Sequence, residues 1–192
     1  MKNTIDIATE RLLLRPIQPQ DAEAVFNYRS NKQVNQYQSF IPESLNEVDH
    51  FIAHKVCHEI NVPGTWIQLV VIKKDDRHLI GDIGVHFHAY DPLHSEIGCT
   101  FNCIYHGQGY ATEALKEIMN VLFYQWGKER ISASVDPRNN PSIRLMERLG
   151  FTKEAHLKES YYIHGIWEDE LIFAMLKENW NPITTGLSSE KS

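Results

Sequence analysis

Long hydrophobic runs are missing from this chain of 192 residues, and no stretch approaches the roughly 18 consecutive apolar residues of a membrane-spanning helix. The N-terminal stretch MKNTIDIATERLLL also lacks the apolar segment of a signal peptide. Cysteine is scarce: the chain has three, an odd number without CxxC spacing, which indicates neither a disulfide framework nor a zinc site. Together these absences predict a soluble protein with reduced thiols in a cytoplasm.

An excess of basic residues is missing too, since the formal net charge is -6. Nucleic-acid binding is driven by clustered Lys and Arg, so this charge argues against a general nucleic-acid surface. Internal repeats and low-complexity tracts are absent, and a composition of 42% hydrophobic and 23% charged residues is ordinary for one globular domain. We expect a single domain over residues 1–178 and a polar C-terminal tail over residues 179–192.

The chain is organised around the stretch YHGQGYATEALKEIMNVLFYQW, residues 105–126. Gly107 and Gly109 precede a segment whose apolar residues are spaced as one face of a helix. The first turn of a helix has N–H groups without partners and carries roughly half a positive charge. A glycine loop at this position predicts a phosphate or pyrophosphate site, because a side chain would hold the anion away from the backbone. A tight strand-to-helix turn is the alternative that the pattern leaves open.

The strand that enters this loop and the strand that follows its helix form a strand–helix–strand unit, which implies a parallel pair. The loop would then lie at the carboxyl end of the first strand, where ligands bind in open α/β sheets. The last helix is expected between Asn140 as N-cap, with Pro141 at N1, and Gly150 after its end. Apolar periodicity and turn residues predict strands at residues 10–17, 65–74, 78–90, 95–104, 130–135, 152–163 and 165–176, with a turn at His164-Gly165, and further helices at residues 21–28 and 44–60.

Two groups of histidines leave two interpretations open. His50, His54 and His58 recur every four residues on a predicted helix, and His86 and His88 lie two apart on a predicted strand. Either group contains pairs able to ligate a metal. The first group lacks an HExxH pattern, so a solvated histidine face is the simpler interpretation. The second group could also line a substrate cleft, but half-exposed strand residues are the simpler interpretation. We expect no metal site.

Three motifs follow one another along the chain: HGQGYATEAL at the central loop, SVDPRNNPSIRLMERLGF after strand 130–135, and HLKESYYIHGIWEDELIFAML near the end. In order and spacing they resemble the GNAT superfamily of N-acetyltransferases, and within it the branch related to the RimJ/RimL ribosomal-protein N-terminal acetyltransferases. The resemblance covers about residues 9–178. It implies an α/β (α+β) fold with about four helices and a mixed, mostly antiparallel twisted sheet of about seven strands that contains a splayed parallel pair.

The resemblance also implies acetyl-CoA as cosubstrate. Its pyrophosphate would lie on the loop amides and its pantetheine on main-chain groups of the strand before the loop, with Asn139 near the cofactor arm and Ser142 near the sulfur. From the residues alone, Asn139 is equally a loop or capping residue and Ser142 a first-turn helix residue. The family's loop usually starts with Gln or Arg where this chain has His106, a change expected to weaken rather than abolish pyrophosphate binding. The implied cofactor-binding residues are Phe101, Asn102, Cys103, His106, Gly107, Gln108, Gly109, Tyr110, Ala111, Asn139 and Ser142.

Acetyl transfer to nitrogen requires a neutral amine, a donor for the oxyanion and a proton for the departing thiolate. Glu96, at the start of strand 95–104, is the candidate base, acting directly or through water. Asp82 and Glu159 are weaker candidates. Each of the three carboxylates has an alternative interpretation as a hydrogen-bonding or rim residue. The oxyanion donor is expected to be a backbone N–H near residues 99–101.

Ser142 is the candidate proton donor to the thiolate, with Tyr161 or Tyr162 as substitutes. Cys99 and Cys103 raise the alternative of an acetyl-cysteine intermediate, but neither has an identifiable base partner in the sequence. We therefore expect direct attack by the amine in a ternary complex.

The predicted function is transfer of an acetyl group from acetyl-CoA to a primary amine. A protein or peptide N-terminus is favoured as acceptor, with a polyamine or aminoglycoside as the small-molecule alternative. A catalytically weak acyl-CoA-binding or sensing module is a second hypothesis, which His106 favours, and a histidine-rich metal-binding protein of the same fold is a third. No direct nucleic-acid or membrane partner is expected, and monomer and homodimer both stay open.

Overall fold

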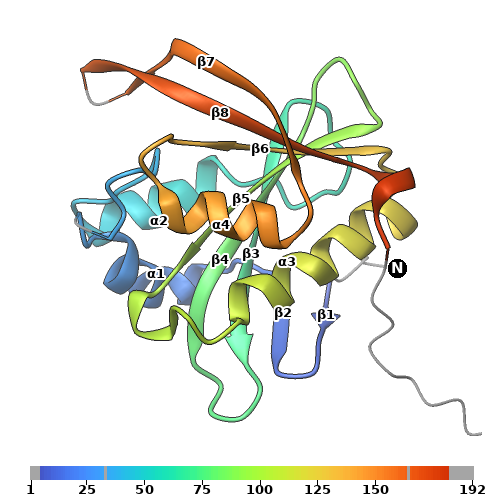
Figure 1. Ribbon diagram of the computed structural model, residues 1–192. Helices are drawn as coiled ribbons and strands as arrows, with labels where there is room; N and C mark the ends of the chain where they lie inside the picture. The colour runs from blue at the N-terminus through green and yellow to red at the C-terminus, as the bar shows by residue number, and fades with distance from the viewer. Residues whose placement is uncertain (1–4, 33, 164, 182–192) are drawn as a thin grey trace, which may run out of the picture.

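The computed structural model describes residues 5–32, 34–163 and 165–181. One eight-stranded sheet, in the order β1-β2-β3-β4-β5-β6-β8-β7, crosses the molecule, with helices on both of its faces (Figure 1). None of the helices in these ranges is long and apolar enough to cross a membrane. The strands are β1 (Ile7–Ala8), β2 (Leu12–Pro16), β3 (Thr65–Lys73), β4 (Leu79–Phe87), β5 (His94–Phe101), β6 (Arg130–Val135), β7 (Thr152–Ile163) and β8 (Ile166–Leu176), and the α-helices are α1 (Ala22–Arg29), α2 (Leu45–His54), α3 (Tyr110–Asn120) and α4 (Asn140–Arg148).

Strand β3 is buried on both faces because the sheet is covered on both sides. Its residues alternate between two apolar clusters. Leu69 and Val71 belong to the larger one, which joins the sheet to α3 and α4. Val70 and Ile72 belong to the smaller one, which joins the sheet to α1 and α2. A continuous apolar run is therefore expected here rather than strict alternation with polar residues.

Helix α3 carries the apolar stripe predicted from the sequence. Ala114, Leu115 and Ile118 are each at most 1% exposed. Full burial of one large aliphatic side chain stabilises the fold by about 1.5–3 kcal/mol, so this stripe fixes the helix firmly on the sheet. The helix therefore presents its N-terminus at a defined position, directly after the glycine loop, and it continues beyond Asn120 as a π-helical turn.

Strands β5 and β6 form the parallel pair that the strand–helix–strand unit predicts, but they pair only along their first residues. The paired positions are His94 with Arg130, Ser95 with Ile131 and Glu96 with Ser132. Beyond Glu96, β5 stays paired with β4 as far as Phe101, whereas β6 pairs with β8 instead. The two strands thus separate after Glu96, which confirms the expected splayed pair.

The sheet has eight strands, one more than the predicted seven, because the two-residue strand β1 was not expected. The predicted helix over residues 44–60 is correct at its start, where the Ser44 side chain accepts a hydrogen bond from the Glu47 amide, but it ends at His54. The amide of Cys57 instead donates to the carbonyl of Trp66 on β3, 2.7 Å away, so contact with the sheet ends the helix early. His58 accordingly does not continue the helical row of histidines.

The start of α4 also differs from the prediction. Asn139, not Asn140, is the N-cap, and its Oδ1 accepts a hydrogen bond from the Ser142 amide at 3.2 Å. Near the C-terminus, Trp180 is buried and its Nε1 donates to Asn120 Oδ1 at 2.8 Å, although it lies within the predicted tail. The predicted tail beyond residue 181, and the His164 half of the predicted turn, lie outside the described residues.

Candidate active site

A cleft of ≈ 1450 Å³ runs along the last residues of β5, beyond the point where β5 and β6 separate. Its lining includes the end of β5, the glycine loop, the first turns of α3 and α4, and the segment 34–38 between α1 and α2. Typical small-molecule pockets measure about 300–1,000 Å³, so this cleft has room for an extended ligand together with a second one. Of the predicted cofactor-binding residues, the cleft brings together Phe101, Cys103, His106, Gly107, Gly109, Tyr110, Ala111, Asn139 and Ser142, while Asn102 and Gln108 are not among the residues that line it.

The glycine loop has the backbone that its sequence predicts. Gly107 and Gly109 have φ angles of +74° and +83°, in the left-handed region that side chains rarely adopt. A Cβ at Gly107 would meet no heavy atom of the protein within 4 Å, so the absent side chain leaves open space over the loop. Gly109 is the N-cap of α3 and has no side chain to cap the first turn. The unpaired N–H groups of that turn are therefore free to bind an anion.

An arginine in the connection between β1 and β2 supports this loop. The Arg11 guanidinium lies over the ring of Tyr110, 4.4 Å from its centroid, and donates to the carbonyl of Gln108 at 3.1 Å. Its Nε also pairs with Glu113 Oε2 at 2.6 Å. Burial alone would raise the pKa of Glu113, but hydrogen bonds from Thr9 and Arg11 hold it below its usual range. A charged Glu113 thus fixes Arg11 beside the loop, a role that the sequence did not reveal.

His106, the departure from the family's usual loop sequence, binds the protein itself. Its Nε2 donates to the carbonyl of Phe101 at 2.9 Å, which ties the loop to the end of β5. Asn102 and Gln108 have similar local roles: the Asn102 side chain accepts from the Ile104 amide, and Gln108 donates to the Ile104 carbonyl. These three side chains therefore shape the loop, and its backbone amides stay available to a ligand.

The cleft also has a basic wall, which the sequence analysis missed. Lys116 on α3 and Arg144 and Arg148 on α4 line it, and Arg148 donates to Thr112 at 3.3 Å. The cleft lining also contains three carboxylates, Glu10, Glu113 and Glu117, of which Glu113 is paired with Arg11. The spacing of Arg144 and Arg148, four residues apart on a helix, was a signal that could have placed both on one face.

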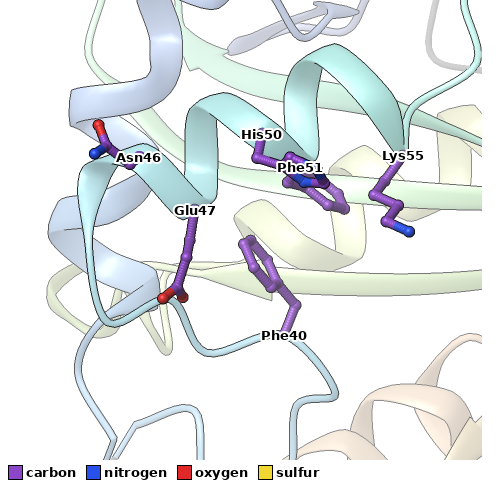
Figure 2. Close-up of a pocket in the computed structure, with 6 residues that line it drawn as sticks. All are labelled: Phe40, Asn46, Glu47, His50, Phe51 and Lys55. Atoms are coloured by element: carbon purple, nitrogen blue, oxygen red, sulfur yellow. The ribbon is translucent and has the colours of Figure 1, made fainter.

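The segment 34–38 is held over the other end of the cleft by a small hydrophobic contact. Phe40 stacks on Phe51 of α2, with ring centroids 4.7 Å apart. Figure 2 shows Phe40 reaching from its loop toward α2, where the two rings lie in a shallow pocket of ≈ 310 Å³. The carbonyl of Phe40 accepts a hydrogen bond from Arg29 at 3.3 Å, which connects this loop to α1.

Asp82, a weaker base candidate from the sequence, has a structural role instead. It is 1% exposed and accepts hydrogen bonds from Arg29, at 2.9 and 2.5 Å, and from Tyr28 and Gln68. Burial alone would lower the pKa of Arg29, but Asp82 raises it above its usual range, and burial with the Asp82 charge raises the pKa of Tyr28. With its oxygens fully engaged, Asp82 has no free lone pair for a substrate proton, so the proposed base role is wrong.

Comparison with known proteins agrees with this geometry. Residues 11–152 match the family model described as Acetyltransferase (GNAT) domain. The chain is 36% identical over 177 residues to YnaD of Bacillus subtilis (strain 168), described as an uncharacterized N-acetyltransferase, with 91% of this chain and 99% of YnaD covered. The chain belongs to the GNAT acetyltransferase family. It is therefore an N-acetyltransferase, and the family uses acetyl-CoA.

Two further relatives extend the comparison. The [Ribosomal protein uS5]-alanine N-acetyltransferase of Escherichia coli (strain K12) is 24% identical over 182 residues, covering 93% of this chain and 94% of that protein. The crystal structure of a GNAT-family acetyltransferase from Bacillus anthracis superposes with a TM-score of 0.80 at 30% identity, covering 91% of this chain and 99% of that one. The expected GNAT fold and the RimJ/RimL-like resemblance are thus confirmed.

In this GNAT domain, Glu96 lies beside the cleft rather than in its lining. It is the last β5 residue paired with β6, and its side chain shares a face of the sheet with His86, its cross-strand partner on β4. Burial raises the pKa of Glu96, and the charge of Glu170 on β8 adds to the effect. Cys99, the first β5 residue in the lining, is three residues further on, about 10 Å along the strand. A proton reaching Glu96 from the cleft therefore has to cross water.

Cys99 lines the cleft, yet it is a poor nucleophile. Burial, with the charge of Asp82, raises the pKa of its thiol to about 12. The remaining candidates, Glu159, Tyr161 and Tyr162, lie on the β7–β8 hairpin, and none of them is among the residues that line the cleft. Glu159 sits at a bulge of β7 with φ +46°, where its amide donates to Asp169.

Proposed function

We propose that this N-acetyltransferase transfers the acetyl group of acetyl-CoA to a primary amine, preferably the N-terminus of a peptide or protein. The observation that carries the proposal is the cleft itself, which is lined by the glycine loop and by the last residues of β5, where β5 is no longer paired with β6. It offers backbone amides for a pyrophosphate at one end and unpaired strand groups for the amides of pantetheine in the middle.

Two further observations support acetyl-CoA as the ligand. The open space over Gly107 allows an anion to reach the loop amides, and the basic wall of Lys116, Arg144 and Arg148 adds positive charge for phosphate groups.

The proposed chemistry is a direct transfer. The amine nitrogen attacks the thioester carbonyl, the C–S bond breaks, and the amine loses a proton to Glu96 through water. The thiolate takes a proton from Ser142, which regains one from water. Ser142 lines the cleft at the first turn of α4, where Asn139 fixes the backbone. An acetyl-cysteine route through Cys99 is disfavoured because its thiol, with a pKa of about 12, is almost entirely protonated at neutral pH.

The preference for an N-terminus follows from amine basicity. At pH 7.5 an α-amine of pKa about 7.8 is roughly one third neutral, whereas a lysine of pKa about 10.4 is roughly 0.1% neutral. A site whose candidate base acts only through water favours the acceptor that needs less help. The name of the Escherichia coli relative, which gives an alanine of ribosomal protein uS5 as its acceptor, agrees with this choice.

The test is release of the free CoA thiol from acetyl-CoA in the presence of peptide N-termini, polyamines, free amino acids or aminoglycosides. The proposal predicts the highest kcat/KM with peptide N-termini. Faster turnover of a polyamine or an aminoglycoside would contradict the acceptor class. Acetyl-CoA binding by calorimetry without turnover of any amine would favour the alternative of an acyl-CoA-binding module.

The two proton-transfer roles have separate tests. Ser142→Ala should lower kcat much more than it weakens acetyl-CoA binding, and equal losses would mean that Ser142 only positions the cofactor. Glu96→Gln should lower kcat/KM by roughly 100-fold or more, the usual contribution of a general base. Glu170→Gln is the matched control, because it removes a neighbouring carboxylate without touching the proposed proton path. Equal losses in both variants would assign the effect to local charge.

A further inference from the structure

A group of three possible metal ligands lies on the face of the sheet that carries Glu96. His86 is at the end of β4, His88 follows it two residues later, and Glu96 is the cross-strand partner of His86 on β5. One ligand atom from each residue lies within 4.8 Å of the other two. Ligands of a tetrahedral Zn²⁺, at about 2.0–2.2 Å from the metal, are about 3.4 Å apart, so small side-chain rotations would bring these three into range.

The three side chains are little engaged by the rest of the protein, apart from a hydrogen bond between His86 and the backbone of Gly64. No hydrogen bond joins any of them to another side chain within the described ranges, and His86 Nδ1 is buried without a partner there. Polar groups left unpaired away from water carry a cost, which a bound ligand removes. All three residues are half-buried, so solvent reaches the cluster, although the Nδ1 atom of His86 itself is covered.

Neighbouring residues hold the cluster in place. The ring of His86 stacks on Trp66, with centroids 4.9 Å apart, and the ring of His88 stacks on His94 at 4.0 Å. His94 is itself hydrogen-bonded to Ser132 Oγ at 2.8 Å. These ring contacts restrict the orientations of the His86 and His88 imidazoles. Glu170 lies close enough to Glu96 to add negative charge, which favours a cation.

We propose that His86, His88 and Glu96 form a binding site for a divalent transition metal of the Zn²⁺ type, with a fourth position open to water. Two imidazoles and one carboxylate are a ligand set that suits Zn²⁺, whereas Ca²⁺ and Mg²⁺ prefer oxygen ligands alone. The site is separate from the cosubstrate cleft, since none of its three residues is among those that line the cleft. The metal is a ligand of this face, and the acetyl transfer proposed above does not require it.

The experiment is calorimetric titration of untagged protein with ZnCl₂, repeated with CoCl₂ for its ligand-field spectrum. The proposal predicts one ion per chain and a tetrahedral Co²⁺ spectrum. His88→Gln should weaken Zn²⁺ binding by more than about tenfold, because loss of even an outer-shell partner costs about 10–100-fold. Glu96→Gln should weaken it as well, which keeps the test decisive if one of the variants folds poorly.

His54→Gln is the matched control. His50 and His54 lie one helical turn apart on α2, with ring centroids 4.7 Å apart, and are a competing histidine pair. The proposal predicts that this variant binds Zn²⁺ as the unmodified protein does. Loss of binding in His54→Gln, unchanged binding in both His88→Gln and Glu96→Gln, or no binding by the unmodified protein would each overturn the site. None of these readouts depends on acetyl transfer, so the site and the proposed function can fail separately.

Discussion

Replacing Asp82 by asparagine should be among the most destabilising single changes in this protein. The carboxylate is 1% exposed, and its partner Arg29 is 7% exposed. Asp82→Asn leaves the guanidinium of Arg29 charged and buried without its counterion, because the pKa of this group is far above neutrality. Breaking a buried ion pair from one side costs about 3–5 kcal/mol. For a domain of 150–250 residues, 1 kcal/mol changes Tm by about 2–4 °C, so we expect Tm to fall by roughly 6–20 °C.

The assay is thermal and urea unfolding followed by circular dichroism, with a double-variant cycle as control. Arg29→Met/Asp82→Leu removes both charges, and it should be more stable than Asp82→Asn, because an apolar pair of similar volume often replaces a buried ion pair without loss. Tyr28→Phe removes one neutral donor and should cost less, about 1–3 kcal/mol. The reasoning fails if the free energy of unfolding of Asp82→Asn lies within about 1 kcal/mol of that of the unmodified protein. It also fails if the double variant loses as much stability as the single variants Arg29→Met and Asp82→Leu lose together.

Three further predictions concern the cleft and the metal site. Gly107→Ala should raise the Kd of acetyl-CoA, measured by calorimetry, roughly 5–30-fold, because the new side chain fills the open space over the loop and costs about 1–2 kcal/mol of left-handed backbone strain. Gly127→Ala is the control: Gly127 also has a positive φ, +70°, but it does not line the cleft, so its Kd should be unchanged. Iodoacetamide at pH 8 followed by mass spectrometry should modify exposed Cys103 and spare Cys99, whose thiol pKa is about 12; equal rates would refute the assigned environment of Cys99. ZnCl₂ should inhibit acetyl transfer because the bound ion occupies Glu96, and a chelator should restore the activity. The variant His88→Gln should be less sensitive to this inhibition; equal inhibition of His88→Gln and the unmodified protein would show that Zn²⁺ inhibits at another site.

Features set by local physics could be predicted from the sequence. The apolar stripe of α3 and the left-handed turns at Gly107 and Gly109 follow from helical spacing and from glycine. The limits of β6 and β7 also agree with the expected ranges 130–135 and 152–163. These elements depend on residues that are close together in the chain, where periodicity and turn residues carry the information.

Features set by contacts between distant segments could not be predicted in this way. The early end of α2 depends on a hydrogen bond from Cys57 to β3, and the support of the glycine loop by Arg11 depends on the pairing of β2 with the rest of the sheet. Asp82 looked like a free carboxylate between a glycine and an isoleucine. Its burial against Arg29 appears only when α1 packs on β4.

The His86–His88–Glu96 cluster shows why a spacing rule alone could not weigh these histidines. Two histidines at i and i+2 project from the same face of a strand, but a pair is a weak ligand set, and the sequence analysis therefore favoured half-exposed strand residues. The third member of the cluster comes from the register between β4 and β5, which places Glu96 opposite His86. A shift of one residue would move the Glu96 side chain to the other face of the sheet. The register is fixed by the buried face, where Val85 pairs with Ile97 in the main core. The apolar packing that builds the core thus also determines which polar groups meet on the opposite face.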